Sequence, residues 1–75
     1  MKQELFDMLY TASLAERSKA LLTLNLLSEH PAGIGDHSTG DFYNNAEEAL
    51  SALVDADDKI ATLEKYFTNK EQING

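Results

Sequence analysis

The sequence predicts an all-α protein in which two helices of similar length fold back on each other as an antiparallel hairpin. Two observations predict this fold. Apolar residues in the second half keep a seven-residue repeat whose steps alternate between four and three, and the only proline and three of the four glycines gather between residues 30 and 40. Such a stripe holds one face of a helix against a partner helix. The repeat forms a predicted core seam of Phe42, Ala46, Ala49, Leu53, Ala56, Ile60, Leu63 and Phe67.

The first predicted helix covers about residues 3–29, where strong helix formers dominate and neither glycine nor proline occurs. Ser13 followed by Glu16 matches a capping box, so a bend or a new helix start near Ser13 is an open alternative. Nothing at that point forbids helical dihedral angles. A continuous or mildly bent helix is therefore the favoured interpretation.

The connector is predicted at residues 30–40 because Pro31 disfavours helical geometry at the residue before it and glycines permit positive φ angles. The second helix is expected from about 41 to 67, and residues 68–75 form a mostly polar tail that we expect to fray. Residues 1–75 thus make one helical-hairpin domain.

Folding back at the connector makes the numbers of facing residues add up to about 72. Large side chains then mostly meet small ones, as interlocking layers require. Lys19 is the misfit in this arrangement, because it faces Leu53 and has to direct its ammonium group toward Asp57 or solvent. The predicted pairs are Leu26 with Ala46, Leu22 with Ala49 or Leu50, Ala15 with Ala56, Ala12 with Ile60, Met8 with Leu63 and Leu5 with Phe67.

Four leucines of the first helix, Leu14, Leu21, Leu24 and Leu27, lie off this predicted seam. Leaving them in water forgoes several kcal/mol at about 25 cal/mol per Å² of apolar area. They therefore predict an interface through which hairpins associate, most simply as a twofold dimer that forms a four-helix bundle. A competing interpretation is that these leucines dock a different protein.

Composition limits the function classes. The 75 residues contain no cysteine and carry a net charge of −7. Residues 41–67 hold seven acids and two bases, a net charge of −5, so binding of nucleic acid is not expected. No apolar stretch reaches the roughly 18 to 20 residues of a membrane span, and we expect a cytoplasmic protein without membrane attachment.

Outside the predicted helices, titratable residues gather around the connector. Carboxylates and imidazoles suit zinc or another divalent ion, but their spacing here matches no metal motif and is typical of turn and capping roles. We therefore expect no metal, no cofactor and no enzymatic activity, and keep the four residues as weak metal candidates: His30, Asp36, His37 and Asp41.

The segment HPAGIGDHSTGDFY at residues 30–43, with AEEAL at 46–50 and DADDKIATLEKYF at 55–67, resembles a family of short, mostly uncharacterised proteins of tailed bacteriophages, including cyanophages. The resemblance covers roughly residues 20–67 and is most specific in the loop. It implies a phage protein made in an infected bacterial cell, and it carries over no activity or ligand.

These observations predict a small non-enzymatic protein that self-associates through its first helix. We expect its acidic second helix or its connector to bind a host or phage protein. Two alternatives stay open: a small-ligand or metal-binding module at the connector, and a structural component of a virion.

Overall fold

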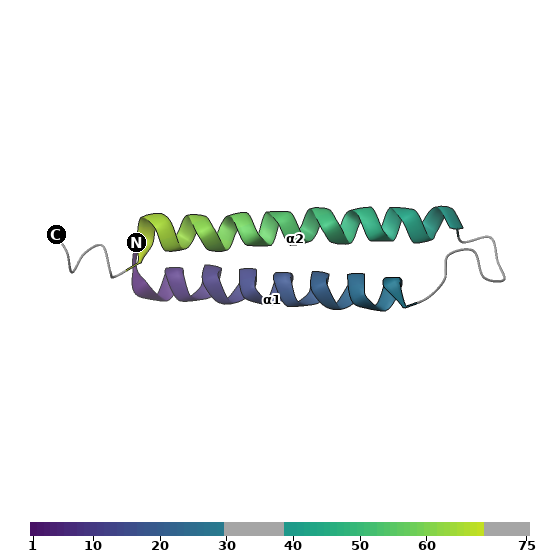
Figure 1. Ribbon diagram of the computed structural model, residues 1–75. Coiled ribbons are helices and arrows are strands. Elements are labelled where there is room, and N and C mark those ends of the chain that lie inside the picture. Colours follow the sequence, from purple (N-terminus) through teal and green to yellow (C-terminus); the bar gives the residue numbers. More distant parts are fainter. Residues whose placement is uncertain (30–38, 69–75) are drawn as a thin grey trace.

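The protein is an antiparallel pair of helices. The computed structural model describes residues 1–29 and 39–68, in which α1 (Gln3–Ser28) and α2 (Thr39–Phe67) lie side by side along their lengths (Figure 1). Those residues contain no strand, and the chain start lies beside the end of α2. The prediction of an all-α helical hairpin is confirmed. The predicted connector falls outside the described residues up to residue 38, as does the tail from residue 69.

Helix α1 is continuous through Ser13. The Ser13 hydroxyl donates a hydrogen bond of 2.8 Å to the backbone carbonyl of Leu9, one turn earlier in the same helix. Ser13 is also buried, with 4% of its surface exposed. It therefore satisfies its hydroxyl within an unbroken helix and does not cap a new one.

Helix α2 begins at Thr39, two residues earlier than expected. Asp41 lies in its first turn and Lys65 in its last turn. Both charges oppose the helix dipole at their own end, which favours helix formation. Gly40 has open space around the place where a Cβ would stand, so packing does not demand a glycine there.

The apolar stripe of α2 faces α1. Ala49, Ala56, Ile60 and Leu63 are buried, while Phe42, Ala46 and Leu53 are half-buried. Phe67, the last residue of the stripe, keeps 38% of its surface exposed at the end of the hairpin. The seven-residue repeat thus identified the face of α2 that contacts its partner helix.

The face that α1 turns toward α2 differs from the predicted one. Leu5, Met8, Leu22 and Leu26, which the pairing assigned to the seam, are 46%, 56%, 60% and 50% exposed. Ala12, Ala15 and Lys19 are exposed as well. We call these seven residues the outer stripe. Two buried and five half-buried residues follow the heptad on the side that packs on α2, and we call them the inner stripe: Phe6, Tyr10, Ser13, Arg17, Ala20, Leu24 and Leu27.

Polar contacts between the helices accompany this rotation of α1. The Tyr10 hydroxyl donates to the Glu64 carboxylate at 2.7 Å, and the guanidinium of Arg17 lies 3.7 Å from the carboxylate of Asp57. Both side chains come from the inner stripe and would point away from α2 in the predicted orientation. Arg17 thus takes the partner that the sequence assigned to Lys19.

The predicted alignment along the helices is close to the observed one. The residue numbers joined by these two contacts add up to 74, near the expected value of about 72. The seam prediction for α1 was therefore wrong in rotation about the helix axis and nearly right in register.

Small residues line the middle of the seam. Ser13 and Ala20 of α1 and Ala49 and Ala56 of α2 are all buried. Short side chains on both helices let the backbones approach closely and leave little volume for large side chains between them. Among the described residues, no side chain larger than alanine is completely buried, and Ile60 keeps 6% exposure.

Candidate interaction surfaces

The outer stripe of α1 is an uncovered heptad repeat. Its residues follow one another in steps of three and four, the same spacing that packs α2 on α1. Exposed polar residues border it on one side: Glu4, Thr11, Ser18 and Asn25. Positions that fall between the seam positions of a heptad lie on the far side of the helix, so the outer stripe faces nearly opposite to α2. An apolar stripe of this kind on a helix surface is typical of an interface.

A second apolar surface lies on one flank of the hairpin. Leu21 stands one turn after Arg17, and Leu50 stands two turns before Asp57, so both share the flank of the Arg17–Asp57 ion pair. Leu21 is 45% exposed and Leu50 is 54% exposed, and Val54 beside Leu50 is 51% exposed. This flank patch, Leu21, Leu50 and Val54, is shorter than the outer stripe.

The four leucines predicted to form an interface do not share one surface. Leu14, Leu24 and Leu27 are half-buried, and Leu24 and Leu27 belong to the inner stripe that packs on α2. Only Leu21 is exposed. The uncovered leucines of α1 are mostly those that the sequence had assigned to the seam. The sequence did contain a signal for them, because α1 carries two heptad stripes offset by one to two residues, of which only one can face α2.

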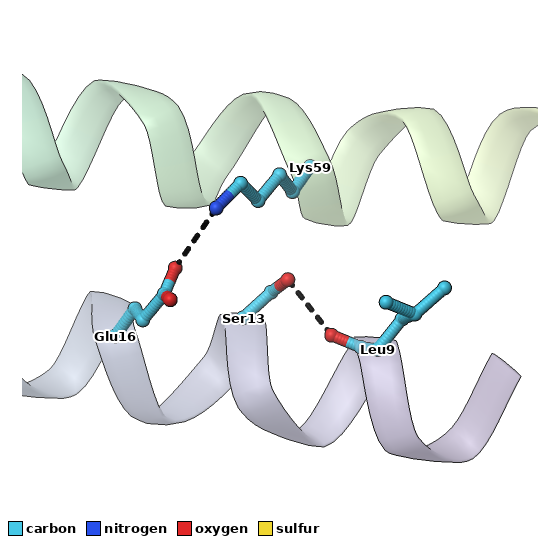
Figure 2. A network of polar contacts seen from close by, with 4 residues as sticks. All are labelled: Leu9, Ser13, Glu16 and Lys59. Atoms are coloured by element: carbon cyan, nitrogen blue, oxygen red, sulfur yellow. Dashed lines mark hydrogen bonds and ion pairs between the residues drawn. The ribbon is translucent and has the colours of Figure 1, made fainter. Parts of the chain in front are cut away.

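The opposite flank of the hairpin is an open groove with a charged rim. Residues of both helices line it: Glu16, Lys19, Ala20, Thr23, Glu48, Ala52, Asp55 and Lys59, among others. The ammonium of Lys59 lies 3.3 Å from the Glu16 carboxylate and spans the groove, as Figure 2 shows beside Ser13 and Leu9. The side chains of this ion pair are 57% and 51% exposed, so water screens it and it contributes little to stability.

The outward side of α2 is acidic. Glu47, Glu48, Asp55 and Asp58 are all exposed on it. Their charges repel phosphate groups and attract cationic surfaces. By charge, this face suits a basic protein surface better than a nucleic acid.

Tyr10 has a pKa that its surroundings alter. Its hydrogen bond to the Glu64 carboxylate raises the pKa of Tyr10 above the ordinary value of 10.0, because the neutral phenol is the form that donates. Burial and the negative charge of Glu64 raise it further, while Arg17 lowers it. The contact thus fastens the start of α1 to the end of α2 while Tyr10 keeps its proton.

The weak metal candidates lie mostly beyond the described part of the chain. His30, Asp36 and His37 fall within residues 30–38, and Asp41 is exposed in the first turn of α2. Within residues 1–29 and 39–68, no three histidine, aspartate or glutamate side chains converge in a way that could hold a metal ion.

Searches among protein-family models, curated proteins and solved structures found no match to this chain. In the described part of the chain, neither helix combines the length and apolar character needed to cross a membrane.

Proposed function

We propose that this is a small non-enzymatic interaction protein that associates with itself through α1 and presents the acidic face of α2 to a host or phage protein. The observation that carries the proposal is the uncovered heptad repeat of the outer stripe. Its four large side chains are 46–60% exposed in the isolated hairpin. A thin two-helix core gains most from covering such a stripe.

The heptad spacing favours another helix as the covering element. A stripe of alternating three and four steps keeps one line of side chains in contact with a neighbouring helix over its whole length. A second copy of α1 provides a helix of equal length with the same stripe. Self-association therefore needs no other component.

Sedimentation equilibrium over a range of micromolar concentrations tests the self-association. We expect twice the mass of the 8.3 kDa chain, with dissociation on dilution. A single species of 8.3 kDa at all of these concentrations would refute it.

The partner is proposed from charge. The resemblance of the loop to phage proteins makes an infected bacterial cell the source from which to capture it, and the exposed carboxylates of α2 favour a basic surface. We expect a bacterial or phage protein to be retained by the native chain and released by added salt. A variant with Glu48→Gln and Asp55→Asn should lose it, whereas Asn44→Gln, which changes no charge on the same helix, should keep it. Equal retention by both variants would contradict a role for the acidic face.

A further inference from the structure

We propose that two hairpins pair through their outer stripes in antiparallel orientation, about a twofold axis that passes between Ala15 and Lys19. The proposal rests on the self-association proposed above and specifies its geometry. Each α1 then lies between its own α2 and the α1 of the second copy. The occupant of the outer stripe is thus a second copy of this chain.

Side-chain size favours this register. With the axis at that level, Leu26 faces Met8 of the second copy, and Leu22 faces Ala12. Large residues at one end of the stripe then meet the small or flexible residues of the other copy, as close packing requires. Moving one copy by a heptad toward its start places the charged Lys19 against Met8 and sets Leu22 against Leu5, a large side chain against a large one.

Charge selects the orientation. Lys19 is exposed and has no hydrogen bond or ion pair with any described residue. A parallel pair in register would bring the two Lys19 ammonium groups together across the seam. In the antiparallel pair, Lys19 faces Ala15, whose small side chain leaves room for the long lysine stem.

The antiparallel arrangement also gives Lys19 a partner. Glu16 stands one turn before Lys19 at the border of the outer stripe, so near the axis it comes beside Lys19 of the second copy. Half of the Glu16 side chain is exposed even with Lys59 bound at 3.3 Å, so its carboxylate can accept a second cation. The Glu16 carboxylate then lies between two cations, Lys59 of its own chain and Lys19 of the second copy.

The resulting assembly is a single layer of four helices. Because the outer stripe faces nearly opposite to α2, the two α1 helices occupy the middle of the layer and the two α2 helices its edges. This differs from the compact four-helix bundle expected from the sequence. It also leaves both acidic faces of α2 accessible to a partner.

Site-directed cross-linking tests the geometry, since the full chain has no cysteine of its own. Thr11→Cys and Asn25→Cys place single thiols at exposed positions on the same border of the outer stripe. The two variants are treated with a short bis-maleimide separately and after mixing, and the products are identified by mass spectrometry. Light scattering on the same samples reports whether they are dimers.

In the antiparallel pair, Thr11 lies near Asn25 of the second copy, while the two Thr11 positions are about 12 residues apart along the helices, roughly 18 Å at 1.5 Å per residue. We expect the mixture to give about tenfold more cross-linked dimer than either variant alone. Dimers that cross-link mainly within the separate variants would show parallel pairing and overturn the proposal. Dimers that cross-link in none of the samples would place the interface elsewhere, leaving self-association intact, whereas monomers throughout would refute the self-association itself.

Discussion

Replacing Leu22 of the outer stripe by glutamine should weaken self-association strongly. Leu22 is the most exposed leucine of the stripe, with 60% of its surface accessible in the hairpin. Complete burial of a leucine contributes about 1.5–3 kcal/mol, so covering the exposed part contributes roughly 1–2 kcal/mol in each copy. A twofold dimer loses this contribution twice, about 2–4 kcal/mol, which raises the dissociation constant by roughly thirty-fold to several hundred-fold.

The matched control is Leu50→Gln on the flank patch. Leu50 is 54% exposed, and glutamine supports a helix nearly as well as leucine, so both substitutions remove a similar apolar area from a helix surface. Sedimentation equilibrium gives the dissociation constant of each variant, and circular dichroism checks that each keeps its helices. An unchanged constant for Leu22→Gln, or an equal loss for Leu50→Gln, would refute the assignment of the interface to the outer stripe.

Three further predictions follow from the seam and its contacts. Ile60→Ala removes three carbons from a residue that is 6% exposed and should lower the free energy of unfolding by about 2.5–4 kcal/mol. Val54→Ala, at a half-exposed position, should lower it by less than about 1 kcal/mol. Urea denaturation of both variants at one protein concentration compares the two losses, and equal losses would contradict the described packing. Glu64→Gln should lower the pKa of Tyr10 toward 10.0 in an ultraviolet titration. Because the fold raises the pKa of Tyr10, the contact stabilises the protein fully at pH values below the ordinary pKa, and this stabilisation is lost as the pH rises through the raised pKa. An unchanged titration of Tyr10 in Glu64→Gln would show that the hydrogen bond does not form. Lys19→Glu adds two carboxylates at the twofold axis and should raise the dissociation constant by about tenfold or more, an effect that salt should reduce and whose absence would count against the antiparallel pair.

The sequence was sufficient to predict the face of α2 and insufficient for α1, and the reason is physical. Helix α2 has one heptad stripe and an acidic outer side, so only one rotation buries its apolar residues. Helix α1 has two stripes, and the outer one is the more apolar because the inner one contains Ser13 and Arg17. Hydrophobicity alone therefore favoured the wrong stripe.

Contacts between side chains far apart in sequence accompany the observed rotation of α1. Tyr10 and Arg17 each find an acidic residue on α2, and no local pattern in α1 encodes where those acids stand. The alternative of a new helix start at Ser13 failed for a similar reason. The spacing of Ser13 to Glu16 matches a capping box, but the Ser13 hydroxyl donates its hydrogen bond to the Leu9 carbonyl within the same helix. The candidate interface consequently moved from the leucines at 14, 21, 24 and 27 to the outer stripe, which becomes visible only once the rotation is known.

The small core between α1 and α2 has a consequence for how long the folded protein would persist at different concentrations. Since alanine is the largest described side chain that is wholly enclosed, few large side chains cover the backbone amides of the two helices. Pairing of the hairpins as proposed would protect the central α1 amides from exchange and from proteases, and dilution would remove that protection. A cell making few copies would then clear them quickly, whereas a burst of synthesis would let the protein accumulate.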